Sequence, residues 1–126
     1  MNYDEIANEF LDEFPEYIPL YMEHIEFNGE VLPHGFFGET LSEDLLKLIE
    51  ENKDKVKIDA IFTFLERMAM DGDQEVKNLL MVTILERLGD EPTLLRDAVF
   101  NYMGEKTKQA SIVIERFWGR DFNIYE

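Results

Sequence analysis

Apolar residues recur at helical spacing from the first residues of the chain. Near the N-terminus they fall at intervals of three and four positions, which places them on one face of an α-helix. This first stripe consists of Tyr3, Ile6, Ala7, Phe10 and Phe14. Pro15 ends this helix or opens the next one at its first turn. A second helix is predicted over residues 16–28, ending at Asn28 and Gly29. Its predicted buried stripe is Ile18, Tyr21, Met22 and Ile25.

The next segment, GEVLPHGFFGET at residues 29–40, breaks this pattern. Its three glycines and one proline predict an ordered loop. Ser42 is then the expected N-cap of a helix over residues 42–55, because acidic side chains follow it in the first turn. The adjacent Phe36 and Phe37 have two interpretations. They plug the core beneath the loop, or they form an exposed contact patch.

The second half of the chain predicts four further helices, over residues 57–70, 74–89, 90–103 and 107–118. The helix over 74–89 is apolar nearly all round in its middle, which indicates a central, buried position. Asp73 is its candidate N-cap. The last helix is expected to bury Ala110, Val113, Ile114 and Phe117.

The C-terminal residues, RDFNIYE at 120–126, predict an extended tail or a short strand. Trp118, Phe122, Tyr125 and Arg120 in and before this tail are of types enriched at binding hot spots. The alternative is that they dock the C-terminus onto the body of the protein.

The pattern as a whole predicts an all-α fold of about seven antiparallel helices. Residues 1–126 are expected to form a single domain, since the length fits one and the 45 % hydrophobic fraction suffices for a core. Two forms remain open, an irregular bundle and a short HEAT-like helical stack.

Charge divides the chain into two unlike parts. Residues 1–52 carry fourteen acidic side chains against one basic residue, Lys47, a net charge of −13, whereas residues 53–126 carry −3. Such one-sided charge attracts a basic partner and repels phosphate, so direct binding to nucleic acid or to a membrane surface is not expected. We therefore interpret residues 1–52 as acidic helices on a charge-balanced helical scaffold.

The residues that carry catalytic or metal chemistry are sparse. The chain has no cysteine, its only serines are Ser42 and Ser111, and neither His24 nor His34 completes a metal motif. The DGDQE sequence at 71–75 begins like a calcium loop but lacks the required glycine and glutamate further on. The sequence therefore predicts a protein that is not an enzyme and that holds no cofactor and no metal.

The expected location is the cytoplasm. The N-terminal residues MNYDEIANEF are acidic rather than basic as a signal peptide requires, and no apolar run is long enough to span a membrane. The absence of cysteine suits a reducing compartment.

Three segments resemble a known family. They are LPHGFFGE at 32–39, FLERMAMDGD at 64–73 and QEVKNLLMVTILERLGD at 74–90, and they cover under half of the chain. These segments are similar to small bacterial immunity proteins of contact-dependent growth-inhibition and polymorphic toxin systems. The resemblance implies a cytoplasmic protein that binds and blocks a toxin domain, often a basic nuclease. It transfers no catalytic residue and does not identify the binding face.

The charge and the resemblance together predict an immunity protein that neutralises a cationic toxin domain. The candidate toxin-binding residues are Asp12, Glu16, Glu23, Glu26 and Glu30, with Asp71 and Asp73 on a helix-end turn as a second choice. The alternatives are a HEAT-like acidic adaptor that binds a basic or helical peptide, and a nucleic-acid mimic. An enzyme would need convergent carboxylates with perturbed pKa values in a pocket. The sequence leaves the oligomeric state open.

Overall fold

The computed structural model describes residues 1–120, and these form seven helical rods without a strand. The rods are α1 (Ile6–Glu13), η1 with α2 (Pro15–Tyr17 and Ile18–Asn28), α3 with η2 and α4 (Pro33–Phe37, Gly38–Ser42 and Glu43–Glu51), α5 (Lys55–Asp71), α6 with η3 and α7 (Gln74–Leu79, Leu80–Leu85 and Glu86–Gly89), α8 (Pro92–Asn101) and α9 (Glu105–Phe117). The all-α prediction of about seven helices is confirmed.

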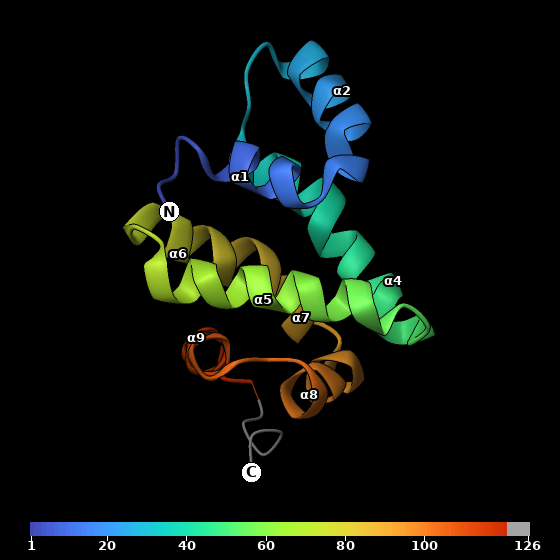
Figure 1. The fold of residues 1–126 in the computed structure, drawn as a ribbon. Helices are drawn as coiled ribbons and strands as arrows, with labels where there is room; N and C mark the ends of the chain where they lie inside the picture. Colours follow the sequence, from blue (N-terminus) through green and yellow to red (C-terminus); the bar gives the residue numbers. More distant parts are fainter. Residues whose placement is uncertain (121–126) are drawn as a thin grey trace.

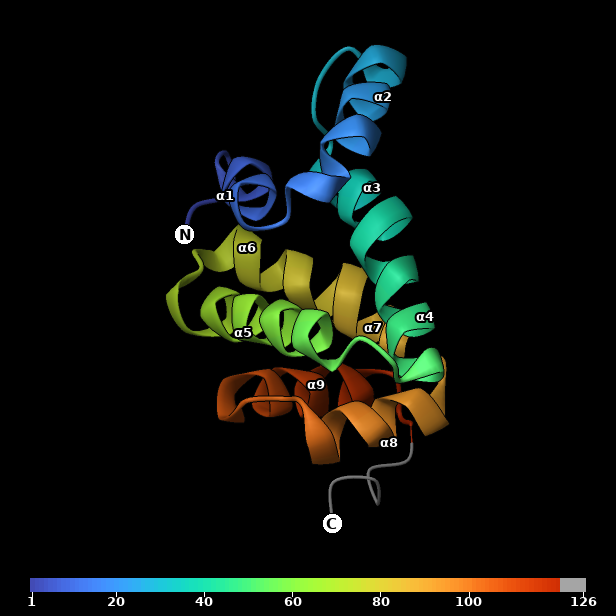
Figure 2. The same cartoon turned by 45° about the vertical axis from the view of Figure 1, so that its right-hand side comes forward.

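The rods stack in layers to form an irregular bundle (Figures 1 and 2). The α5 rod and the α6–α7 rod lie side by side in the middle, with α8 and α9 packed beneath them. The α3–α4 rod runs down one side of this stack and α1 lies across its top. Helix α2 points away from the other helices at the same end of the molecule.

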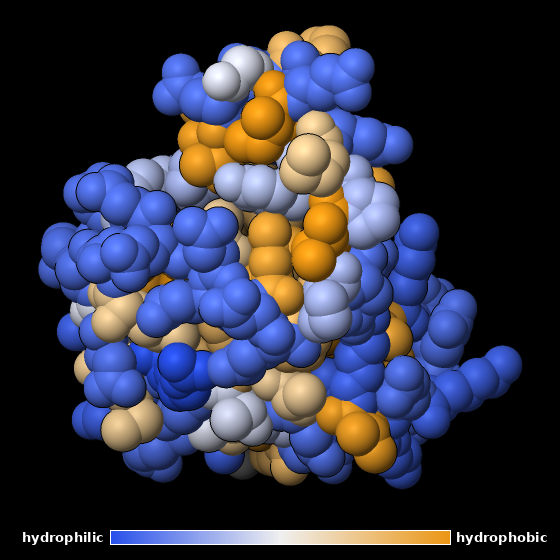
Figure 3. Space-filling view, turned by 45° about the horizontal axis from the view of Figure 1, so that its top comes forward, coloured by the Kyte–Doolittle hydropathy of each residue, from blue (hydrophilic) through white to orange (hydrophobic). Residues whose placement is uncertain are grey.

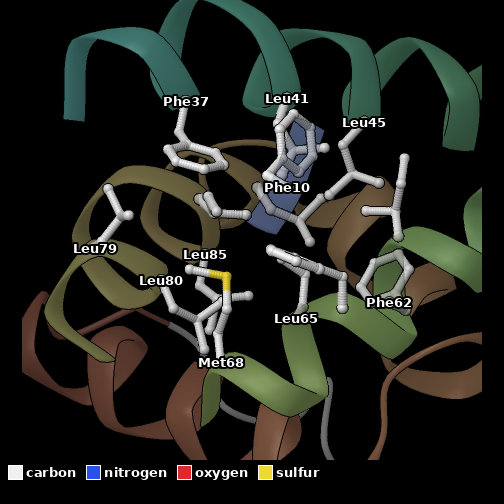
Figure 4. Close-up of a cluster of buried hydrophobic side chains, with 14 of the residues drawn as sticks. Phe10, Phe37, Leu41, Leu45, Phe62, Leu65, Met68, Leu79, Leu80 and Leu85 are labelled. Carbon is white, nitrogen blue, oxygen red and sulfur yellow. The ribbon is translucent and has the colours of Figure 1, made fainter. Parts of the chain in front are cut away.

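One hydrophobic core joins these layers, and Phe10 of α1 lies at its upper end (Figure 4). Its ring, which is 0 % exposed, contacts five other aromatic rings with centroids 5.0 to 6.2 Å away. These rings belong to Phe14, Tyr17, Phe36, Phe37 and Phe64. The first predicted stripe is therefore correct, because Ile6, Ala7, Phe10 and Phe14 are buried and Tyr3 is partly buried.

The predicted loop over residues 29–40 is wrong over most of its length. Only Gly29–Leu32 lies outside a helix, and a continuous rod begins at Pro33, whose fixed φ suits the first turn. Ser42 is consequently inside the rod and does not cap it; its hydroxyl donates to the Thr83 carbonyl oxygen at 3.0 Å. Phe36 and Phe37 are both fully buried, so they belong to the core and form no contact patch.

The central helix is as predicted, with Val76, Leu79, Leu80, Ile84, Leu85 and Leu88 buried and Asp73 as its N-cap. The expected stripe of α9 is half wrong. Ile114 is buried and Ala110 partly buried, but Val113 and Phe117 are exposed, because the inward face uses Thr107, Ser111 and Glu115. Of the residues in and before the tail, Trp118 is exposed at the end of α9 and Arg120 forms ion pairs with Asp90 and Glu115, whereas Phe122 and Tyr125 lie outside the described range.

A carboxylate from α5 caps α9. Glu66 accepts hydrogen bonds from the backbone amides of Lys106 and Thr107 and from the Thr107 hydroxyl, at 2.8 to 3.0 Å. Partial burial raises the pKa of Glu66, but these hydrogen bonds outweigh it and the net pKa is lowered. Gly104 leaves the necessary space, since a Cβ there would lie 2.5 Å from the Glu66 carboxyl carbon.

Replacing Glu66 with glutamine should therefore destabilise the protein in a pH-dependent way. We expect a loss of about 1 kcal/mol at pH 7, because the amide nitrogen of glutamine faces a backbone amide that needs an acceptor. The lowered pKa means that Glu66 stabilises the fold fully above its unfolded pKa of about 4.3 and loses this effect as the pH falls through the folded pKa. Urea unfolding of both proteins at pH 7 and pH 3 tests this; an equal difference at the two pH values would contradict it.

Candidate functional site

The structural feature that points to function is α2 with the loop Gly29–Leu32, which we call the arm. Among its residues only His24 is buried. Phe27 is 90 % exposed and Met22 is 59 % exposed, and Ile18, Leu20 and Leu32 are exposed as well. Hydrophobic side chains accordingly gather at the arm end of the molecule, whereas much of the body is hydrophilic on the same face (Figure 3). A patch of this kind on a projecting element is typical of a protein-binding site.

The predicted buried stripe of this helix is wrong in two of its four positions. Tyr21 and Ile25 are partly buried, but Ile18 and Met22 face solvent. The periodicity correctly predicts a helix, but α3 covers only part of its apolar side, through the contact of Tyr21 with Phe36. Sequence reasoning also missed Leu20 and Phe27 as site residues. Their signal is present in the sequence, because both lie off the predicted stripe and so cannot share its burial.

The outward surface of α2 has an ordered pattern. At about 100° per residue, Glu23 and Glu26 lie near the middle of the exposed arc. Leu20 and Phe27, seven positions apart, form one apolar edge of this arc, and Ile18 and Met22, four positions apart, form the other. The arm thus presents an acidic strip between two apolar edges.

His24 fixes the arm in place. Its Nε2 atom accepts a hydrogen bond from the Leu32 amide at 2.9 Å, which ties the end of the loop back to the helix. Its other ring nitrogen, Nδ1, lies 3.2 Å from the side-chain amide nitrogen of Asn28 and 3.8 Å from Glu39 Oε2. The ring also packs on Phe36 of the core, with centroids 5.8 Å apart. His24 is therefore a structural anchor of the arm.

Three of the predicted site residues lie together on the arm. Glu23, Glu26 and Glu30 are exposed and make no ion pair with any residue in the range 1–120. The arm, residues 18–32, contains no Lys or Arg, so these side chains give it a charge of −3. Elsewhere, basic side chains of the second half neutralise acids of the first: Arg67 pairs with Glu13, and Arg87 with Glu43 at 3.2 Å.

The other two first-choice residues lie outside the arm. Asp12 is exposed on α1. Glu16 lies in η1 and pairs with Lys57 of α5 at 3.1 Å. Partial burial raises the pKa of Glu16, but a backbone hydrogen bond and Lys57 outweigh it and lower the pKa overall. Because Glu16 already has a cationic partner, it has less charge to offer a second protein than the acids of the arm.

The second-choice residues have structural roles. The carboxylate of Asp73 accepts hydrogen bonds from the Val76 amide at 2.8 Å and the Tyr3 amide at 3.0 Å, and these bonds lower its pKa. The Asp71 carbonyl oxygen accepts a hydrogen bond from the N-terminal amine of Met1 at 3.0 Å. The turn that carries both residues therefore anchors the N-terminus, and a toxin contact there stays a prediction.

The remaining surface offers a broad depression between α4, α7 and α8, with a volume of about 630 Å³. Its lining mixes acids with Lys47 and Arg87, and Arg87 is already engaged by Glu43 and Glu91. Among residues 1–120, no group of three or more His, Asp or Glu side chains is placed to hold a metal ion. None of the described helices is long and apolar enough to cross a membrane.

Comparison with known proteins gives one match. The model of a family described as a domain of unknown function, DUF7674, matches residues 7–119. No curated protein and no solved structure matches the chain. The matched range begins within α1 and extends past the end of α9, so it includes the arm and every layer of the bundle. The chain therefore belongs to the DUF7674 family.

Proposed function

We propose that this protein is an immunity-type inhibitor that binds and neutralises a cationic toxin domain, of the basic nuclease kind, in the cytoplasm. The observation that carries the proposal is the arm, in which exposed apolar side chains stand beside three acids without a cationic partner. The resemblance of segments within residues 32–90 to immunity proteins supports a toxin domain as the partner.

The physical argument rests on two contributions to binding. Residues 1–52 carry −13, and a field of this sign steers a basic partner toward the protein and raises the association rate. Affinity then comes mainly from a few desolvated side chains at the centre of the interface. The arm offers both kinds of group on one rigid element, and it needs no catalytic residue to block a toxin.

Reversing the charge of the arm tests the proposal. The variant Glu23→Lys, Glu26→Lys and Glu30→Lys should weaken binding to the toxin about a hundredfold, because three attractive contacts become repulsive. The partner for this test is the product of a toxin-like reading frame sought directly upstream of the gene, and the absence of such a reading frame would favour the acidic adaptor. The affinity for this product is measured by calorimetry, and protection is measured by growth of cells that express the toxin.

A matched control keeps the net charge change the same. Reversal of Glu51, Asp59 and Asp97, three exposed acids of the body, should alter binding by only a fewfold through the long-range field. Equal binding by the arm variant and the wild-type protein would overturn the proposal, as would a neighbouring product that is not toxic. Binding without protection would favour the acidic adaptor instead.

A further inference from the structure

We infer that the arm docks as a helix against a protein surface in which Lys or Arg side chains are bordered by apolar walls. This inference rests on the proposed function, in that the partner is a cationic protein, and it adds how that partner is recognised. Recognition of this kind places one face of a helix in a groove and reads it through anchor side chains at helical spacing.

The two apolar edges of the arm determine the shape of the partner surface that can contact them. Phe27 and Leu20 on one side and Met22 and Ile18 on the other lie about 140° or more apart around the helix axis, with Glu23 and Glu26 between them. A flat surface cannot contact both edges at once, whereas a groove can. Cationic side chains at the floor of such a groove would meet the acids, and their aliphatic stems would pack on the apolar edges.

Charge excludes two other occupants of this surface. A second copy of the chain would bring the same −3 arm and the same total of −16 into contact, which is repulsive. A membrane is equally unsuitable, because helices that lie in the lipid interface carry Lys and Arg on their polar face and the anionic leaflet repels acids. With a second copy and a membrane excluded, a cationic protein is the remaining occupant of this surface.

The arm is also preorganised for binding. His24 is 4 % exposed and joins the helix to Leu32 and to the ring of Phe36, so the helix does not have to order when it meets its partner. Tyr21 adds a second aromatic contact to Phe36, with centroids 5.3 Å apart. A fixed, projecting helix keeps more of its contact energy as affinity than a flexible one.

The experiment uses the full chain and a defined probe. The probe is a synthetic helical-hairpin peptide whose two helices form a groove, with arginines on its floor and leucines along both walls, and binding is followed by fluorescence anisotropy. We expect the double variant Leu20→Ser and Phe27→Ser to bind the peptide about tenfold to a hundredfold more weakly than the wild-type protein. Exchange of the leucines of the peptide for serine should remove this difference.

The control changes one aliphatic and one aromatic exposed residue of the body, Val56→Ser and Phe100→Ser, and should bind as the wild-type protein does. Equal binding of the peptide by the arm variant and the wild-type protein would overturn the inference, as would failure of the peptide to bind at all. The same variants measured against the toxin separate the two proposals. Loss of toxin binding on charge reversal but not in the Leu20 and Phe27 variant would leave the function standing and remove the docking mode. Peptide binding that depends on the arm, without protection from any toxin, would leave the docking mode standing and remove the proposed function.

Discussion

Replacing Phe10 with alanine should lower the free energy of unfolding by about 3–5 kcal/mol. The side chain is fully buried, and its ring is the one that joins α1 to η1, the α3–α4 rod and α5. Its removal leaves a cavity among aromatic rings that cannot all collapse, because they are held on several different elements, with Tyr17 in η1, Phe37 in α3 and Phe64 in α5. The loss also includes the edge-to-face contacts with Phe37 and Phe64.

Urea unfolding measured by circular dichroism gives the required free energies. Phe27→Ala is the matched control, because the same truncation at a 90 % exposed position should change stability by less than about 0.5 kcal/mol. Similar values for the two variants would show that the aromatic cluster does not hold the upper layer to the stack. Such a result would also mean that the packing of α1 does not stabilise the end of the molecule from which the arm projects.

The sequence pattern predicts the buried face of α1 correctly and that of α2 only in part, and one physical reason explains both outcomes. Both helices have apolar residues at helical spacing, and periodicity reports which residues share a face. It does not report whether a partner exists for that face. The stripe of α1 meets the core, while that of α2 is only partly covered by Phe36 and its neighbours. Coverage is a property of the tertiary fold, so local pattern could not predict it.

The helical start at Pro33 was missed for a related reason. Gly35 and Gly38 have low helix propensity, and a local reading gives them to a loop. In the fold both lie inside the rod, where an added Cβ would make only an ordinary van der Waals contact, 3.6 Å from His24 at Gly35 and 3.6 Å from Thr83 at Gly38. Burial of the neighbouring Phe36 and Phe37 in the core therefore outweighs the low propensity of the two glycines.

The crossing of the α3–α4 rod and the central rod shows a further limit of local pattern. Each rod contains a π-helical turn, Gly38–Ser42 in one and Leu80–Leu85 in the other, and the two turns contact each other. Widened turns free backbone carbonyls, and the Thr83 carbonyl takes its hydrogen bond from Ser42 of the facing rod. His34 approaches the Thr83 hydroxyl at 2.6 Å beside it. The residue pattern of neither helix predicts this contact between the two turns.

For the candidate site, the distribution of charge along the sequence indicates which acids lack an ion pair, whereas the exposure of the apolar side chains cannot be predicted from the sequence. Glu23, Glu26 and Glu30 were identified because nothing basic lies near them in the chain, and in the fold they also have no ion pair among residues 1–120. Glu16 was chosen on the same grounds, yet Lys57 reaches it from α5. Sequence separation conceals such pairing, so linear charge density overstates the free charge of α1 and η1 and describes that of the arm correctly.

Arg120 creates the second large effect that we expect. It lies just beyond α9 and pairs with Asp90 at 2.6 Å and with Glu115 at 2.7 Å, and it donates to the Glu86 carbonyl oxygen. The Glu115 side chain is 3 % exposed. Burial raises the pKa of Glu115, and Arg120 partly offsets this. Gly89 completes the arrangement, since a Cβ there would lie 2.4 Å from the Glu115 carboxylate. The basic residue of the tail is thus part of the fold.

Replacing Arg120 with methionine should therefore cost about 3 kcal/mol at pH 8, because it leaves a buried carboxylate without its cation. An acid whose folded pKa is raised stabilises the fold most below its unfolded pKa of about 4.3, and this stability is lost as the pH rises through the folded pKa. Loss of Arg120 raises the pKa of Glu115 further, so the destabilisation should be clearly smaller at pH 5 than at pH 8. Urea unfolding at the two pH values measures this difference.

The double variant Arg120→Met with Glu115→Gln separates the charge effect from the lost packing. With no carboxylate to leave unpaired, it should recover most of the stability at pH 8 and lose the dependence between pH 5 and pH 8. Equal stability of the single and double variants at pH 8 would mean that Arg120 acts through Asp90 and the Glu86 carbonyl rather than through Glu115. In that case the C-terminal end of α9 would be held by surface contacts, and removal of Arg120 would cost no more than about 1 kcal/mol at any pH.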